Sequence, residues 1–226
     1  MKLVRRIAAL AMVAALSLGA TKQPAANWLA QVSVTPNGAH IIGNPKARVR
    51  LVEYVSYTCS HCAAFEQQAS GELGLGFIRP GTGSVEYRPF MRNIVDITAT
   101  LLVNCGPASR FPLNHSSVLR SQQKWMADVS ETQQRRWLTI GDFPSRMRAI
   151  AGDMHLYELF AARGYSRVEL DRCLADEGLA KRISQENQAA SQVGSVDSTP
   201  SFLINDRQQD VHDWAGLRPL LMALTR

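Results

Sequence analysis

Hydrophobic positions along the chain change spacing several times, and each change marks an expected element. Residues 48–57 are rich in β-branched and aromatic side chains, which is typical of a buried central strand. Residues 84–91 are a second strand candidate, in which Pro89 indicates an edge strand or the end of a strand. Residues 28–35 and 40–42 flank a Pro-Asn-Gly turn and are expected to form two short strands.

A helix is expected between the two longer strand candidates. From Cys59 onward, the apolar residues Cys62, Phe65 and Ala69 lie at positions i, i+3 and i+7, which places them on one face of a helix. Three glycines in residues 71–76 are expected to end this helix. A strand, a helix and a second strand in this order predict a right-handed parallel unit.

Helical spacing then dominates residues 94–192, where no convincing strand is found. The chain returns to strand patterns at residues 201–205 and 208–212, which a tight connection at residues 206–207 would join into a hairpin. An amphipathic helix over residues 214–224 closes the chain. The helical block is too long for a single crossover between strands, so it predicts a helical subdomain inserted into an α/β domain.

The first twenty residues have a different pattern. Three basic residues precede an apolar run over residues 7–18, and small residues follow it, which is typical of a secretory signal peptide. A membrane anchor is the alternative, but the run is shorter than the ~20 residues that span a bilayer. We therefore expect four segments: a signal peptide at 1–20, a first part of the α/β domain at 21–93, the helical insertion at 94–180, and a second part of the domain at 181–226.

Composition and charge narrow the range of functions. The chain has 226 residues, of which 46% are hydrophobic, so it can bury a substantial core. Its formal charge of +6 would fall to about +3 on removal of Lys2, Arg5 and Arg6 with the signal peptide. The remaining basic residues are scattered, so nucleic acid is not expected as a partner.

The four cysteines carry the strongest chemical signal. Outside the cytosol thiols tend to be oxidised, and four cysteines allow three pairings. One close pair exists, Cys59 and Cys62 in the sequence Cys-Ser-His-Cys, and it lies at the expected start of a helix. The unpaired N–H groups there favour a thiolate at the first sulfur, whereas the second faces inward one turn later. We therefore predict that Cys59 is the nucleophile and Cys62 the resolving thiol of a redox-active disulfide.

Two neighbouring residues are expected to influence this pair. A protonated His61 would add positive charge beside the Cys59 thiolate, which stabilises the dithiol form and makes the disulfide a stronger oxidant. Glu53 is anomalous, because a carboxylate in the middle of a buried strand is costly. A zinc site and an inert structural disulfide remain alternatives, but no second cysteine pair lies at zinc-ligand spacing.

A Thr199-Pro200 pair precedes the late strand, and spacing alone predicts a trans peptide bond there. The signal peptide, the Glu six residues before Cys-x-His-Cys, the helical insertion and the Thr-Pro-x-Phe-x-Ile-Asn segment together resemble the DsbA-like branch of the thioredoxin superfamily. The resemblance implies a thioredoxin fold, in which helices flank a mixed central sheet. It also implies a periplasmic enzyme that donates disulfides to exported proteins.

The resemblance implies further roles for individual residues. Thr199 and Pro200 match the cis-proline loop that packs beside the disulfide, and Glu53 matches the buried acid that moves protons for Cys62. The implied partners are unfolded exported proteins with reduced cysteines and a membrane quinone-linked, DsbB-like reoxidant, with no bound cofactor. Ser60 departs from the proline of the best-known members, and Thr199 stands where strong oxidants often have valine.

Cys105 and Cys173 lie on apolar helical stripes. In an oxidising compartment we expect them to form a structural disulfide, and two unpaired buried thiols are the alternative. A disulfide isomerase or reductase on the same fold is the nearer functional alternative. Such isomerases usually carry a dimerisation domain, and residues 21–48 are too few to form one. We therefore expect a monomer. The more distant alternative is a metal-handling or holdase module without enzymatic activity.

Overall fold

The computed structural model describes residues 26–126, 128–192 and 196–225. The expected signal peptide, residues 1–20, lies outside the described residues. Within the described ranges, no helix combines the length and the apolar character needed to span a membrane.

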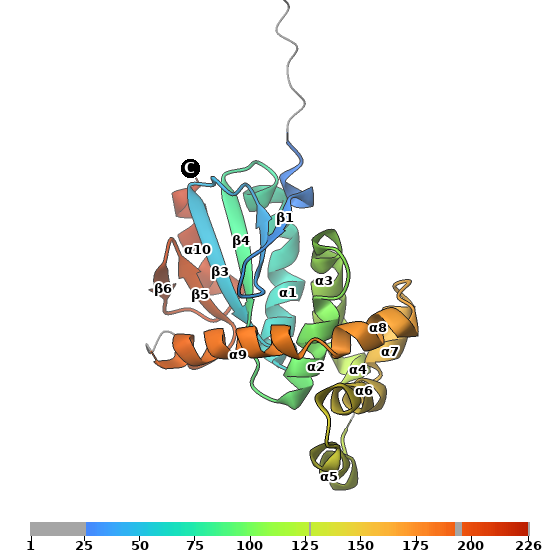
Figure 1. Cartoon of the computed structure of the whole chain (residues 1–226). Coiled ribbons are helices and arrows are strands. Elements are labelled where there is room, and N and C mark those ends of the chain that lie inside the picture. Colours follow the sequence, from blue (N-terminus) through green and yellow to red (C-terminus); the bar gives the residue numbers. More distant parts are fainter. Residues whose placement is uncertain (1–25, 127, 193–195, 226) are drawn as a thin grey trace, which may run out of the picture.

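Six strands form one mixed sheet in the order β1-β2-β4-β3-β5-β6 (Figure 1). The strands are β1 (Val32–Val34), β2 (His40–Gly43), β3 (Val49–Val55), β4 (Gly83–Pro89), β5 (Ser201–Ile204) and β6 (Arg207–Gln209). The two central strands, β3 and β4, run parallel, and every other neighbouring pair is antiparallel. The expected parallel unit is therefore present, and Pro89 ends β4, where its missing N–H costs the sheet little.

Two helices in the described part of the chain, α1 (Ser60–Glu72) and α10 (Trp214–Leu224), lie outside the segment between β4 and β5, and the other helices form that segment. The others are α2 (Ile94–Val103), α3 (Phe111–Arg120), α4 (Gln122–Trp125), α5 (Glu131–Thr139), α6 (Phe143–Asp153), α7 (Leu156–Ala161), α8 (Arg167–Leu174) and α9 (Glu177–Gln192). Short helical turns are η1 (Trp28–Ala30), η2 (Leu73–Ile78) and η3 (Ala108–Arg110). Figure 1 shows α9 returning from the other helices of this segment to the sheet.

Alternation along β3 separates the two faces of the sheet. Leu51 and Val55 belong to the main hydrophobic core, together with residues of α1, α2, α3 and α10. Val52 and Tyr54 belong to a smaller cluster on the other face, which Ala190 of α9 joins. Because β3 is buried on both faces, its sequence is mostly apolar; Arg50 is charged but exposed, whereas Glu53 is charged and buried.

Among the described residues, the segment between β4 and β5 contains helices and no strand. Two of these helices begin with a capping box, in which Ser130 of α5 and Ser166 of α8 each pair with the residue three positions later. α9 extends across residue 180, so the second boundary expected for the helical subdomain falls inside a helix. The boundaries themselves stay a prediction.

Cys105 and Cys173 form a disulfide, as expected from the sequence. Cys105 follows α2 and Cys173 lies in α8, with the two Cα atoms 5.5 Å apart. The bond joins positions 68 residues apart and ties two helices of the segment between β4 and β5 to one another.

The glycines after α1 do not end helical structure where the sequence predicts. α1 continues through Gly71 to Glu72, and the wider turn η2 follows it directly. Leu73 and Phe77 are buried in η2, so packing holds this segment helical despite its glycines. The ring of Phe77 lies against Gly83, where an added Cβ would be 2.2 Å from a ring atom.

The C-terminal hairpin turns one residue earlier than predicted. Its turn is formed by Asn205 and Asp206, with φ of 49° and 65°, rather than by residues 206–207. Asn and Asp tolerate this left-handed backbone better than most residues, which explains the position of the turn. The strand predicted over 208–212 is β6, which ends at Gln209. Residues 28–30 form η1 instead of belonging to the first strand.

Loss of the Cys105–Cys173 disulfide should destabilise the protein. In a Cys59→Ala/Cys62→Ala background, where this is the only disulfide that can form, Cys105→Ala/Cys173→Ala should lower the free energy of unfolding by about 4 kcal/mol on the chain-entropy model. Urea denaturation of the two proteins measures the difference. A loss below about 1 kcal/mol, or free thiols at both positions in the unreduced parent, would contradict this assignment.

Candidate active site

The Cys-x-x-Cys pair lies at the start of α1, shortly after the end of the central strand β3. Cys59 is the N-cap residue of α1, with extended backbone angles, and its carbonyl accepts the first helical hydrogen bond from Ala63 N–H at 3.1 Å. Cys62 lies three residues later and is fully buried, whereas Cys59 retains 4% of its accessible surface. The two sulfurs are not bonded, so the structure describes the dithiol form.

The environment makes the two sulfurs chemically unequal. The pKa of Cys59 is lowered to about 4, first because the Cys62 thiol donates a hydrogen bond to its sulfur and then because the Thr199 side chain and the backbone N–H groups of Cys62 and His61 favour the thiolate. Burial opposes this shift but does not cancel it. Burial raises the pKa of Cys62, and the charges of Cys59 and Glu53 raise it further. The structure therefore supports the predicted division between an anionic first sulfur and a protonated second one.

The Thr199–Pro200 loop reaches the active site because β5 pairs with β3 in antiparallel register, with Ser201 opposite Tyr54. The Thr199–Pro200 peptide bond is cis. In the dithiol form, Cys59 Sγ donates a hydrogen bond to the Thr199 carbonyl at 3.1 Å. The buried Thr199 hydroxyl has no nitrogen or oxygen partner among the described residues, and it favours the Cys59 thiolate.

Glu53 lies on β3, on the same face of the sheet as α1, and is 1% exposed. Its neighbours across the sheet are Tyr87 on β4 and Phe202 on β5. One carboxyl oxygen, Oε1, has no hydrogen-bond partner within the described part of the chain. Burial raises the pKa of Glu53 well above its usual range, and the charge of Glu66 raises it further. Burial therefore favours the protonated form of Glu53, which lies close enough to Cys62 to influence its titration.

The His61 side chain is exposed, as is its neighbour Ser60. In the structure the contribution of His61 to the Cys59 thiolate comes from its backbone N–H rather than from its ring. The role expected for a charged His61 side chain stays a prediction.

Sequence reasoning did not identify Asp96, which anchors the loop before Cys59. The Asp96 carboxylate on α2 accepts hydrogen bonds from Ser56 Oγ at 2.9 and 3.0 Å, from the backbone N–H of Thr58 at 2.9 Å and from the Thr58 hydroxyl at 2.9 Å. It also accepts one from Arg92 N–H, and Asn93 caps the helix through Asp96 N–H. An Asn three residues before an Asp at the start of an apolar helix could have indicated the N-cap at Asn93, but not the contacts of the Asp96 carboxylate with the loop.

Gln122 was also missed. Its side-chain N–H group donates to the backbone carbonyls of Tyr57, at 2.8 Å, and Cys59, at 3.0 Å. A glutamine in a short helix gives no local signal for such a role, because its partners lie more than sixty residues earlier. The helical segment thus holds the active-site loop from two sides, through α2 and α4.

A second group of polar side chains lies behind the cysteines, around the carboxylate of Glu66 on α1. Glu66 is buried, and its Oε1 accepts hydrogen bonds from Ser116 Oγ at 2.6 Å and Arg120 Nε at 3.1 Å, both on α3. His115 of α3 lies beside it, with Nδ1 3.1 Å from the Tyr57 hydroxyl. Sequence reasoning assigned no role to His115 or Glu66.

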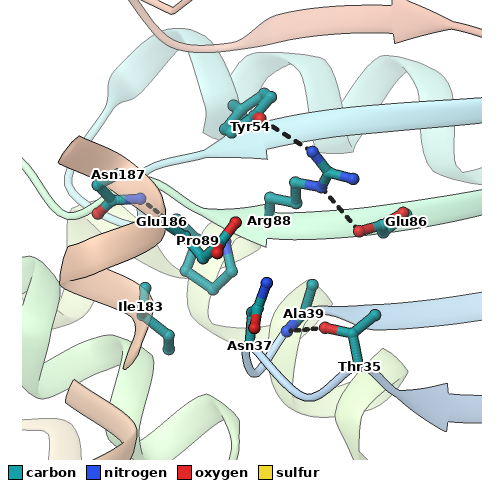
Figure 2. A pocket seen from close by; sticks show the side chains of 10 residues that line it. All are labelled: Thr35, Asn37, Ala39, Tyr54, Glu86, Arg88, Pro89, Ile183, Glu186 and Asn187. Carbon is teal, nitrogen blue, oxygen red and sulfur yellow. Dashed lines mark hydrogen bonds and ion pairs between the residues drawn. The ribbon is translucent and has the colours of Figure 1, made fainter. Parts of the chain in front are cut away.

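The opposite face of the sheet carries a separate cavity of about 280 Å³ (Figure 2). Arg88 lies at its centre, donating to Glu86 at 2.7 Å and to the Tyr54 hydroxyl at 3.0 Å. Because Tyr54 and Arg88 alternate with Glu53 and Tyr87 along their strands, this cavity is separated from the cysteines by the sheet. In the described ranges, no three His, Cys, Asp or Glu side chains are grouped as a metal ion would require.

The family comparison agrees with this geometry. Residues 35–223 match a protein family described as thioredoxin, which covers both cysteines, Glu53 and the Thr199–Pro200 loop. The chain belongs to this thioredoxin family. A solved protein-disulfide isomerase of Novosphingobium aromaticivorans is 45% identical and superimposes with a TM-score of 0.79 over 83% of this chain and 97% of that one.

Two further comparisons show what else this thioredoxin-family protein is similar to. Wolbachia pipientis alpha-DsbA1 has the same fold, with a TM-score of 0.63, 18% identity and coverage of 82% of this chain and 89% of that one. A Rickettsia bellii relative with the provisional name protein-disulfide oxidoreductase is 25% identical over 75% of this chain, which spans 58% of that relative's length. The predicted resemblance and the predicted thioredoxin fold with a helical insertion are both confirmed.

Removal of the Cys62 thiol should raise the pKa of Cys59, because the hydrogen bond donated by the Cys62 thiol makes the largest contribution to the stability of the thiolate. We expect the Cys59 thiolate of the reduced wild type to titrate near pH 4, and that of Cys62→Ala to titrate about one pKa unit higher or more. Ultraviolet thiolate absorbance measures both. Ser60→Ala, at an exposed position, is the control and should match the wild type. Equal pKa values in Cys62→Ala and wild type would contradict the assignment.

Proposed function

We propose that this thioredoxin-family protein is a thiol-disulfide oxidase, which donates the Cys59–Cys62 disulfide to proteins with reduced cysteines. The observation that carries the proposal is the depressed pKa of Cys59, about 4 against an ordinary value of 9.0. A stabilised thiolate stabilises the dithiol form of the protein, so its disulfide tends to accept electrons. The same feature gives a good leaving group when a mixed disulfide is resolved by the substrate.

The reaction consists of two exchanges. A substrate thiolate attacks Cys59 Sγ, so that a substrate–Cys59 bond forms and the Cys59–Cys62 bond breaks. Cys62 leaves as a thiolate and takes up a proton, which Glu53 can supply because its pKa is raised. A second substrate thiolate then attacks the first substrate sulfur and releases Cys59 as a thiolate. The substrate is oxidised by two electrons, and the protein is left as the dithiol.

The Thr199–Pro200 loop would guide the substrate during these steps. It lies against the Cys59 sulfur and presents backbone groups to an extended substrate segment. His212 Nδ1 is 2.8 Å from the Pro200 carbonyl, a contact that helps to hold the loop in place. Glu53 and the loop thus serve different steps, since one moves a proton and the other positions sulfur.

The proposed setting follows from the sequence. The signal peptide pattern supports export to the periplasm, where the substrates would be newly exported proteins with reduced cysteines. A membrane quinone-linked, DsbB-like protein would reoxidise the dithiol. No bound cofactor takes part in this scheme, because both electrons pass between sulfurs.

Disulfide isomerisation is the second candidate, and the name of the Novosphingobium relative favours it. An isomerase works from the dithiol form, in which Cys59 attacks a mispaired disulfide of the substrate and is later released with no net oxidation. The two candidates therefore differ in which redox form of the protein reacts productively.

One pair of assays separates the candidates. The oxidised protein, mixed with a peptide that has two reduced cysteines, should form one peptide disulfide for each protein dithiol produced. The reduced protein, mixed with a substrate that has mispaired disulfides, should restore little native pairing. Cys59→Ala should abolish both reactions, and Cys62→Ala should accumulate the mixed disulfide with an oxidised peptide. Efficient isomerisation with poor peptide oxidation would overturn the oxidase proposal.

A further inference from the structure

Behind the two cysteines lies a buried group of titratable side chains, of which the proposed disulfide exchange uses only Glu53. It comprises Glu53 on β3, Tyr57 in the loop before Cys59, Glu66 on α1, Tyr87 on β4 and His115 on α3. All five are at most 7% exposed. Burying this many polar groups is costly unless each is hydrogen-bonded, so any that lack a partner call for an explanation.

The group forms a row that leads away from Cys62. Glu53 lies opposite Tyr87 in the parallel register of β3 and β4. The ring of Tyr87 is 4.5 Å from that of His115, centroid to centroid. The two ring nitrogens of His115 face different neighbours, since Nδ1 is 3.1 Å from the Tyr57 hydroxyl and Nε2 is 3.8 Å from Glu66 Oε2. A small rotation of either side chain would bring the second distance within hydrogen-bonding range.

Two atoms in this row are buried without a hydrogen-bond partner in the described part of the chain, Glu53 Oε1 and His115 Nε2. Buried polar atoms are usually paired, and each exception calls for an explanation. Glu53 influences the titration of Cys62, and His115 Nε2 faces Glu66 Oε2.

The row ends at a surface groove of about 220 Å³ between α1 with η2 on one side and α3 on the other. Glu66 and Tyr87 line the groove, together with Ser70 and Ser116. Arg120, whose side chain is 49% exposed, contacts the Glu66 carboxylate. Water in the groove can therefore reach Glu66, although the cysteines open at a different place, at the start of α1.

We propose that His115 and Glu66 carry protons between Glu53 and this groove, so that the proton of Cys62 is exchanged with solvent through the helical insertion. The inference rests on the proposed disulfide exchange. When Cys62 resolves a mixed disulfide, its sulfur bonds to Cys59 Sγ, the bond from Cys59 to the substrate sulfur breaks, and the electron pair leaves with the substrate thiolate. The Cys62 proton passes to the Glu53 carboxylate, which must first have lost its own proton to the groove.

The titration behaviour of the group supports this path. Burial lowers the pKa of His115 while Glu66 raises it, which favours a neutral ring able to accept a proton and pass it on. Glu66 raises the pKa of Glu53, so the two carboxyl groups sense each other. The charged and titratable groups that face His115 are Tyr57, Tyr87, Glu66 and His40, and Arg120 faces Glu66 from α3.

Reaction with oxidised glutathione tests the proposal, because it separates two steps. Attack of Cys59 forms the glutathione mixed disulfide, and attack of Cys62 then resolves it. His115→Phe keeps an aromatic ring against Phe111 and Tyr87, and Glu66→Gln keeps the shape of the side chain. Both variants should slow resolution about tenfold or more, less than the roughly 100-fold that a direct acid–base group contributes. Formation of the mixed disulfide should keep its wild-type rate.

The pH profile and chemical rescue distinguish proton transfer from packing. The resolution rate of the wild type should rise with pH as Glu53 loses its proton, and this dependence should be altered in both variants. In His115→Ala, added imidazole should restore resolution, whereas pyrazole, a ring of the same size that is far less basic, should not. His155→Asn, at an exposed position far from the cysteines, is the matched control for loss of a histidine.

Two results would overturn the proposal: wild-type resolution rates and pH profiles in both His115→Phe and Glu66→Gln, or equal rescue of His115→Ala by imidazole and pyrazole. If His115→Ala does not fold, the isosteric Glu66→Gln variant decides the matter alone through its pH profile. Absence of mixed-disulfide formation in the wild type would instead count against the proposed function, so the two failures are distinguishable.

Discussion

The central physical constraint in this protein is the inequality of two sulfurs one helical turn apart. Cys59 lies at the start of α1, where free N–H groups and the Cys62 thiol stabilise its anion, and Cys62 lies in the core, where burial keeps its proton on. The shift has a thermodynamic consequence. Because the folded pKa of Cys59 is lowered to about 4, the thiolate stabilises the folded dithiol fully above the ordinary pKa of 9.0 and loses this effect as the pH falls through 4.

Much of the surrounding fold can be understood as support for that inequality. β3 delivers the chain to the helix start, β5 brings the Thr199 carbonyl to the Cys59 sulfur, and the helical segment holds the intervening loop through Asp96 and Gln122. The buried carboxyl group of Glu53 is costly for stability. Its position beside Cys62 fits our proposal that Glu53 exchanges protons with a sulfur that solvent cannot contact.

The sequence predicted the parts of the structure that local patterns determine. β3, the start of α1 at Cys59, the C-terminal helix and the helical character of residues 94–192 all follow from spacing and residue type. The Cys105–Cys173 bond was expected because the predicted compartment is oxidising. Glu53 was identified as a candidate site residue because a carboxylate is anomalous within an apolar strand. The cis bond before Pro200 followed from the family resemblance, since spacing alone predicted trans.

The missed features depend on distant contacts or on packing. Asp96, Gln122 and His115 meet their partners only after α2, α4 and α3 have folded against the active-site loop, and no local pattern records such contacts. Gly71 stays helical because buried residues of η2 anchor the turn that follows it. The hairpin turn moved by one residue because Asn205 adopts the left-handed conformation as readily as Asp206 does.

The redox potential of the Cys59–Cys62 pair tests the central claim most directly. Equilibration of the protein with glutathione mixtures, in a Cys105→Ala/Cys173→Ala background so that one disulfide is counted, yields this potential. A thiolate stabilised at Cys59 predicts a value nearer the about −120 mV of strongly oxidising proteins than the about −270 mV of reducing thioredoxins. A potential as negative as that of the reducing thioredoxins would contradict the claim that the dithiol is the favoured state.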